Sequence, residues 1–100
     1  MPQIQISEEH LKKIKTILRH YFPTSQIWLF GSRVTGNAKK YSDLDVLIKT
    51  TEHTHATSAF IELKHAFDNS DLPFQIDIVD WDKASTEFRE MVLKEAIILI

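Results

Sequence analysis

The feature that most constrains this chain is the segment 28–48, in which a polar stretch separates two short apolar runs. The stretch opens with Gly31-Ser32 and ends with Asp43 and Asp45, which lie two residues apart where the second apolar run begins. Alternate residues of a β-strand project to the same face, so these two carboxylates are expected side by side. Neighbouring carboxylates repel each other, and a half-buried charge is costly unless something compensates it. The segment therefore predicts either a bound cation or a solvated strand end.

The only two glycines of the chain, Gly31 and Gly36, both lie in this segment. Glycine is favoured where the backbone adopts unusual dihedral angles or approaches another group closely. Backbone N–H groups at a turn after a strand bind anions, and a serine hydroxyl adds a donor. Gly31 and Ser32 are therefore candidates for binding phosphate, with a plain turn as the alternative for these two residues taken alone.

Hydrophobic periodicity predicts an α/β (α+β) domain with the element order α-β-β-α-β-α-β. Ser7 is expected to cap the first helix, and Pro23 to end it. The last helix is expected to begin at Asp82 or Ser85. The length predicts a single domain, residues 1–100. The expected helices are 8–21, 58–67 and one that begins near residue 82. The expected strands are 26–30, 43–49, 74–81 and 96–100, and for the last of these a continuation of the preceding helix is the alternative.

A third carboxylate, Asp77, lies between two isoleucines in the expected strand 74–81. If this strand pairs with the strand that carries Asp43 and Asp45, Asp77 completes a cluster of three acids on one face. Mg²⁺ prefers hard oxygen ligands and is often held by one or two carboxylates together with substrate phosphates. A phosphate-binding turn beside a metal-binding strand is the combination that nucleotidyl transfer requires.

Composition excludes several other classes. The formal net charge of -2 argues against a basic nucleic-acid-binding module, so direct binding of nucleic acid is not expected. The chain has no cysteine, and therefore neither disulfides nor a thiolate metal site. No apolar stretch approaches the roughly 18–20 residues that span a bilayer, and no signal peptide is visible. A cytoplasmic location, with no membrane association, is the expectation.

The stretch GSRVTGNAKKYSDLD resembles the signature of the nucleotidyltransferase superfamily related to DNA polymerase β. Together with IDIVD further along the chain, it is most similar to the minimal nucleotidyltransferases, the MNT-type antitoxins of prokaryotes. The resemblance extends over residues 7 to 100, because the order of helices and strands also agrees. It implies the polymerase β-like nucleotidyltransferase fold, a small mixed β-sheet with flanking helices.

The resemblance also implies a role for each matching position. Gly31 and Ser32 would hold the nucleotide triphosphate, with ATP as the substrate. Asp43 and Asp45 would ligate two Mg²⁺ ions. Asp77 would ligate the catalytic ion and help to deprotonate the attacking hydroxyl.

Other polar residues are weaker candidates. Arg33 is placed in the nucleotide-binding set as a contact to phosphate or to a partner, with a solvated side chain as the alternative. Lys39 and Lys40 precede the aspartates and would meet the triphosphate, although a solvated loop pair is favoured. The spacing of His53 and His55 suits a metal on a strand, but no third ligand is evident.

The catalytic core is expected to occupy almost all of these 100 residues, so that no acceptor domain is expected within them. The resemblance implies that a helical HEPN-type toxin supplies the acceptor, a tyrosine that receives AMP from ATP with release of pyrophosphate. The protein would then be an antitoxin and a protein adenylyltransferase, within a homo- or hetero-oligomer. A non-catalytic antitoxin that neutralises its partner by complex formation is the alternative. A stand-alone transferase with a small-molecule acceptor is a third possibility.

Overall fold

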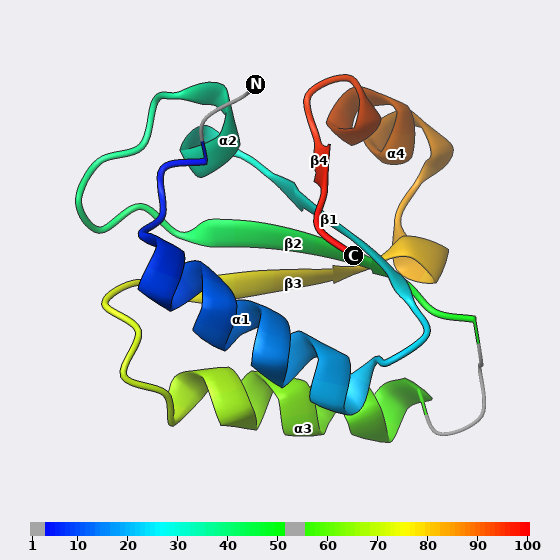
Figure 1. Cartoon of the computed structure of the whole chain (residues 1–100). Coiled ribbons are helices and arrows are strands. Elements are labelled where there is room, and N and C mark those ends of the chain that lie inside the picture. Colours follow the sequence, from blue (N-terminus) through cyan, green and yellow to red (C-terminus); the bar gives the residue numbers. More distant parts are fainter. Residues whose placement is uncertain (1–3, 52–55) are drawn as a thin grey trace.

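A four-stranded mixed sheet forms the centre of the computed structural model, which describes residues 4–51 and 56–100 (Figure 1). The strand order is β3-β2-β1-β4. β1 pairs antiparallel with both β2 and β4, whereas β2 and β3 run parallel. The strands are β1 (Gln26–Phe30), β2 (Leu44–Lys49), β3 (Ile76–Asp80) and β4 (Ile97–Ile98). The predicted fold class is confirmed, and so is the predicted element order apart from two short helices, one after β1 and one after β3.

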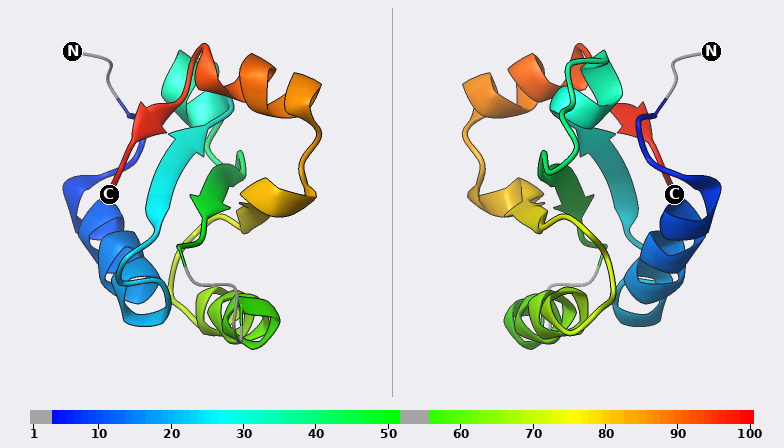
Figure 2. Two further views of the ribbon diagram at one scale, coloured as in Figure 1. Left: turned by 90° about the vertical axis from the view of Figure 1, so that its right-hand side faces the viewer. Right: turned by 90° about the vertical axis from the view of Figure 1, so that its left-hand side faces the viewer.

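Two long helices, α1 (Glu8–Tyr21) and α3 (Ala56–Asp68), cover one face of the sheet (Figures 1 and 2). The predicted N-cap is present, because the Ser7 hydroxyl accepts a hydrogen bond of 3.2 Å from the N–H of His10. Apolar side chains at helical spacing then face the sheet, as the sequence indicates. The fully buried residues of this core are Ile14, Leu18, Ile27, Leu29, Leu44, Val46, Ile48 and Leu63.

A smaller group of elements lies on the opposite face: η1 (Trp81–Lys83) and α4 (Thr86–Leu93) (Figure 2). Ser85, one of the two predicted starts of the last helix, caps α4 by accepting a hydrogen bond of 3.1 Å from Phe88 N–H. The rings of Trp28 and Trp81 stack with centroids 5.2 Å apart. Within the part of the chain that the structure describes, the buried residues of this second cluster are Trp28, Leu47 and Val92.

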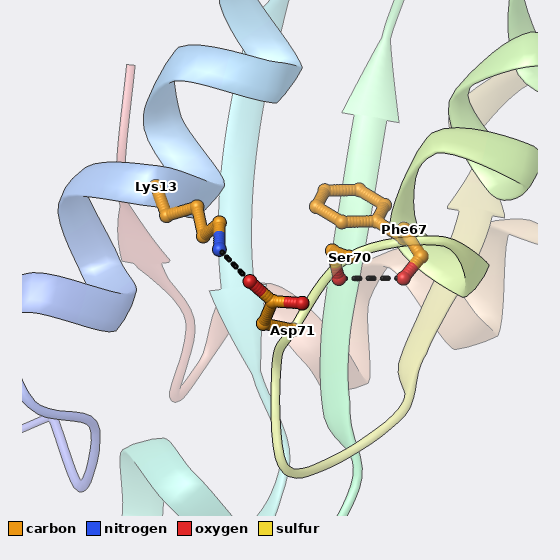
Figure 3. A network of polar contacts seen from close by, with 4 residues as sticks. All are labelled: Lys13, Phe67, Ser70 and Asp71. Carbon is orange, nitrogen blue, oxygen red and sulfur yellow. Dashed lines mark hydrogen bonds and ion pairs between the residues drawn. The ribbon is translucent and has the colours of Figure 1, made fainter.

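The loop between α3 and β3 is fastened to the rest of the molecule by a few polar contacts (Figure 3). Lys13 Nζ lies 3.3 Å from a carboxylate oxygen of Asp71, and the Ser70 hydroxyl donates to the carbonyl of Phe67 at 2.6 Å. An exposed ion pair of this kind contributes about 0–1 kcal/mol, so the strand pairing does more to fix β3 than these contacts do.

Several elements are shorter than predicted. β2 begins at Leu44, so that Asp43 lies just before the strand. β4 contains two residues of the apolar run 96–100, and β3 contains five residues of the expected 74–81. A short helix, α2 (Ser32–Thr35), follows β1. Among the described residues, no helix is both long enough and apolar enough to cross a membrane.

Candidate active site

The parallel pairing of β2 with β3 places Asp45 directly opposite Asp77. Adjacent strands lie about 4.8 Å apart, so side chains at opposite positions are close neighbours. Leu44 and Val46 are fully buried against the α1 and α3 side, and Asp45 between them therefore projects to the other face. The same alternation turns Ile78 toward the helices and Asp77 away from them. The condition on which the role of Asp77 depended, pairing of its strand with the strand of Asp45, is met.

Asp43 completes the acidic cluster from the position just before β2. It is exposed, and it lies near enough to Asp77 to raise the pKa of that residue. Burial raises the pKa of Asp45, and the charges of Asp77 and Asp43 raise it further. Desolvation also raises the pKa of Asp77, as do the charge and the hydrogen bond of Asp43, while Lys64 acts in the opposite direction. The sheet thus brings three mutually repelling carboxylates together.

Gly31 lies against one of these carboxylates. Its φ of 87° is in the region that only glycine adopts readily, and a Cβ atom there would collide with Oδ2 of Asp45. The β1–β2 register explains the contact, because it pairs Phe30, the residue before Gly31, with Asp45. The sequence predicts that some group approaches Gly31 closely. In the structure, the carboxylate of Asp45 does so.

Ser32 begins α2 immediately beside this contact and is half-buried. The carbonyl of Gly31 accepts hydrogen bonds from Val34 at 3.0 Å and from Thr35 at 3.1 Å, which closes the turn. The second glycine, Gly36, ends α2 with a φ of 90°. Both candidate phosphate-binding residues therefore lie in a tightly held turn next to the acidic cluster.

A cleft of about 1000 Å³ runs along β3 between α3 and α4 and contains two of the three acids. Asp45 and Asp77 line it together with Lys64 of α3, Lys83 of η1 and Phe88 of α4. Its volume is at the upper end of the range for small-molecule sites, about 300–1,000 Å³. The cleft therefore has room for a nucleotide next to the paired carboxylates.

Arg33 does not lie where the nucleotide-binding hypothesis placed it. Its side chain is buried, with 6% of the residue exposed. Nε donates to the carbonyl of Ser42 at 2.8 Å, Nη1 to that of Gln5 at 2.7 Å and Nη2 to that of Lys40 at 3.2 Å. The guanidinium also lies 4.0 Å from the ring centroid of Phe74. Neither a phosphate contact nor a solvated side chain describes this arrangement, so we omit Arg33 from the proposed nucleotide site.

The remaining candidates are peripheral. Lys39 and Lys40 are exposed, as expected of a solvated loop pair, and Lys40 Nζ lies 5.4 Å from the ring centroid of Tyr41. His53 and His55 lie outside the described residues.

The described residues contain no group of three or more His, Asp or Glu side chains that is already arranged to hold a metal ion. The chemistry of the acidic cluster nevertheless fits a divalent cation. Its donors are carboxylate oxygens, and the raised pKa values of Asp45 and Asp77 reflect a repulsion that a cation would relieve. Mg²⁺ commonly binds to one or two carboxylates while substrate phosphates complete its ligands. The arrangement suits a metal that binds together with a nucleotide better than one held in a preformed cage.

Comparison with known proteins agrees with this geometry. Residues 12–100 match the family described as "Polymerase beta, Nucleotidyltransferase". A curated relative from Haemophilus influenzae, described as "Probable protein adenylyltransferase MntA", is 44% identical over 97 residues, which are 97% of this chain and 84% of that protein.

Solved structures show the same architecture. One, of a toxin–antitoxin with AMP-PNP, contains a chain that is 26% identical and superposes with a TM-score of 0.66, over 90% of this chain and 72% of that chain. Another holds a tri-AMPylated Shewanella oneidensis HEPN toxin in complex with MNT antitoxin. The matching chain is 25% identical with a TM-score of 0.62, over 95% of this chain and 72% of that chain.

Proposed function

Because the chain belongs to the polymerase beta nucleotidyltransferase family, we propose that it transfers AMP from ATP to a hydroxyl group of a partner protein. The observation that carries the proposal is the opposition of Asp45 and Asp77 on paired strands, with the Gly31 turn in contact with Asp45. Phosphate-binding and metal-binding groups are thereby adjacent, as transfer of a nucleotide requires.

In the proposed reaction, Gly31 and Ser32 hold the triphosphate beside the acidic cluster. The acceptor oxygen attacks the α-phosphorus, a new P–O bond forms, and the bond to the β-phosphate oxygen breaks. Pyrophosphate leaves with the electron pair of that bond. The acceptor proton passes to the carboxylate of Asp77, which lines the cleft opposite Asp45.

Asp43, Asp45 and Asp77 are the residues that would hold two Mg²⁺ ions. When bound, these ions would neutralise the phosphates and stabilise the charge that develops on the attacking and leaving oxygens. The protein itself supplies the fixed strand pairing that sets where the carboxylates lie.

The acceptor that we propose is a tyrosine of a HEPN-type toxin, with this protein as its cytoplasmic antitoxin in a hetero-oligomer. Two findings support it: the name of the curated relative, a protein adenylyltransferase, and the structural neighbour in which an AMPylated HEPN toxin accompanies an MNT antitoxin. The cleft beside Asp77 leaves space for an acceptor side chain as well as for part of the nucleotide.

The test is transfer of label from ATP labelled at the α-phosphate to the HEPN-type partner, with Mg²⁺ present. We expect the wild type to label the partner and release pyrophosphate. Asp43→Asn and Asp45→Asn variants should lose at least about 10³-fold in rate, since each removes a carboxylate that would hold the Mg²⁺ ions, and the ions would stabilise the charge of the transition state. Asp71→Asn, at an exposed carboxylate outside the cluster, is the matched control and should retain the activity.

Neutralisation of the toxin separates catalysis from binding. If the two Asn variants still neutralise the partner as well as the wild type does, a purely binding antitoxin replaces the enzymatic proposal. If the wild type binds ATP with Mg²⁺ and yet labels no protein, the choice of acceptor is refuted.

A further inference from the structure

We propose that Arg33 is a positioning residue that aligns Asp43 with Asp77. This inference rests on the proposed function, because it assigns Arg33 a role in assembling the metal-binding acids. Arg33 itself contacts neither nucleotide nor metal in this proposal. Its guanidinium joins the segment that ends at Asp43 to the segment that leads into β3 and Asp77.

The first connection runs through the loop before β2. The carbonyls of Lys40 and Ser42 accept hydrogen bonds from Nη2 and Nε of Arg33. The Ser42 carbonyl belongs to the peptide unit shared with Asp43, and that unit is planar. Holding this oxygen therefore fixes the plane that ends at the Cα of Asp43.

The second connection runs through Phe74, two residues before β3. The guanidinium lies 4.0 Å from the centre of its ring, a distance at which a cation and an aromatic face attract each other. Phe74 also packs against the main core. Arg33 thus holds the loop before Asp43 in a fixed position relative to the start of β3, the strand that carries Asp77.

The loop is closed by further hydrogen bonds that do not involve charge. Lys39 N–H donates to the Ser42 hydroxyl at 2.8 Å, and Ser42 N–H donates to the Lys39 carbonyl at 3.1 Å. Gln5 N–H donates at 2.8 Å to the carbonyl of Arg33, and the Gln5 side chain accepts from Ala38 N–H at 2.9 Å. These bonds make the loop one connected unit, with the guanidinium at its centre.

The burial of the Arg33 guanidinium needs an explanation, because burial disfavours its charge. Burial lowers the pKa of Arg33, while the charge of Asp43 opposes that effect. No carboxylate of the described residues lies within 4.0 Å of the Arg33 guanidinium, so carbonyl dipoles and the more distant Asp43 compensate its charge. The hydrogen bonds to three carbonyls and the contact with the Phe74 ring therefore offset the desolvation cost, and they hold the loop next to the acidic cluster in place.

Lysine cannot reproduce this geometry. A guanidinium is planar, with five donors in fixed directions and a flat face that stacks on an aromatic ring. An ammonium group donates from a single point and cannot reach three carbonyls in three directions while covering Phe74. Arg33→Lys keeps the charge and loses the alignment, which makes it the informative substitution.

Arg89 supplies a matched control elsewhere in the molecule. Its Nε donates to the carbonyl of Trp81 at 2.8 Å, and its guanidinium lies 4.8 Å from the Trp81 ring centroid. The chemistry is the same, a guanidinium between a carbonyl and an aromatic ring, but the contacts tie α4 to η1 and do not involve the Asp43 loop.

The experiment compares Arg33→Lys with Arg89→Lys in the complex with the partner, by the Mg²⁺ dependence of transfer and by calorimetric titration of ATP with Mg²⁺. For Arg33→Lys we expect the Mg²⁺ concentration at half-maximal rate to rise about tenfold or more, since two or more charged hydrogen bonds are lost. Arg89→Lys should leave this concentration unchanged within about twofold. Circular dichroism at the assay temperature verifies that both variants are folded.

A folded Arg33→Lys variant with the Mg²⁺ dependence of the wild type would overturn the positioning role while leaving the proposed function intact. If Arg33→Lys does not fold, Phe74→Leu replaces it, because it removes the stacking and retains the hydrogen bonds. It should raise the half-maximal Mg²⁺ concentration about two- to fivefold, in line with the loss of one cation–π contact. No change in that variant refutes the proposal.

Discussion

The two faces of the sheet are built very differently. On the face covered by α1 and α3, two helices of 14 and 13 residues bury a continuous core in which eight side chains are fully inaccessible. The other face is covered by a single helix of eight residues and one turn of η1, and two opposed carboxylates line the cleft that runs along β3 between α4 and α3. The face covered by α1 and α3 stabilises the sheet, whereas the other face carries carboxylates that repel one another.

This difference shows how a small domain tolerates an acidic cluster. A strand alternates its side chains between the two faces, so Leu44 and Val46 stabilise β2 while Asp45 between them does not. The cost of crowding Asp45 against Asp77 is met by packing on the opposite face of the same strands. Stability and chemistry are thus separated within single strands, and substitutions on the two faces should have different consequences.

The largest expected difference concerns two leucines on helices of opposite faces. Leu63 on α3 is fully buried, whereas Leu93 on α4 is 41% exposed. Leu63→Ala should lower the free energy of unfolding by about 2–5 kcal/mol, because it leaves a cavity in the main core. Leu93→Ala should lower it by about 1 kcal/mol or less. Urea denaturation measures both, and equal losses would show that the two faces contribute alike.

The two glycines provide a second contrast, at the edge of the cluster. Gly31→Ala should cost about 2–3 kcal/mol of stability, because the backbone is strained and the new Cβ displaces Asp45. Gly36 has a similar φ of 90° but nothing within 4 Å of the added atom, so Gly36→Ala should cost about 1 kcal/mol. Thermal denaturation compares the two variants.

The nucleotidyl-transfer activity of the two glycine variants should differ as well. Gly31→Ala should abolish transfer, because Asp45 cannot remain in place, while Gly36→Ala should retain it. A Gly31→Ala variant that is fully active would show that the position of Asp45 is not critical.

The smallest expected effect is a gain in stability on removing one of the opposed charges. Like charges at opposite positions of paired strands destabilise by roughly 0.2–1 kcal/mol. Asp45→Asn should therefore raise the free energy of unfolding by about that amount at neutral pH without Mg²⁺. Asp71→Asn, which alters only an exposed ion pair, should change it by less than about 0.5 kcal/mol.

The stability difference between the wild type and Asp45→Asn should depend on pH. The pKa of Asp45 is raised in the folded state above its ordinary value of 3.8, by burial first and then by Asp77 and Asp43. Below pH 3.8 the carboxyl is protonated in both states and costs nothing. As the pH rises through the raised folded-state pKa, the wild type loses stability relative to Asp45→Asn. Urea midpoints across this range measure the loss, and added Mg²⁺ should diminish it. A variant less stable than the wild type at neutral pH contradicts the repulsion.

Much of this architecture follows from local patterns in the sequence. The cap at Ser7, the spacing of Leu11, Ile14 and Leu18, and the alternation around Asp45 each reflect a rule that acts over a few residues. The pairing of Asp45 with Asp77 was predicted conditionally, since it needs the two strands to be neighbours. The register of the structure meets that condition.

The features that the sequence did not reveal are contacts between distant segments. Nothing local to Arg33 indicates that its guanidinium meets the carbonyl of Gln5 and the ring of Phe74. Every residue has a backbone carbonyl, so neither composition nor residue spacing indicates which carbonyls a side chain will contact. The collision of a Gly31 side chain with Asp45 likewise depends on the strand register, although the glycine itself was a signal that something lies close.

The opposition of Asp45 and Asp77 has a consequence for how such a protein can diverge. Their separation is set by main-chain hydrogen bonds between two strands, and the strand spacing is the same whichever apolar side chains cover the sheet. The core can therefore exchange its residues over generations without moving the carboxylates. Insertion of one residue into β2 or β3 is different, because it turns every following side chain to the opposite face. Replacement of one apolar core residue by another in these strands is therefore tolerated where a change of strand length is not.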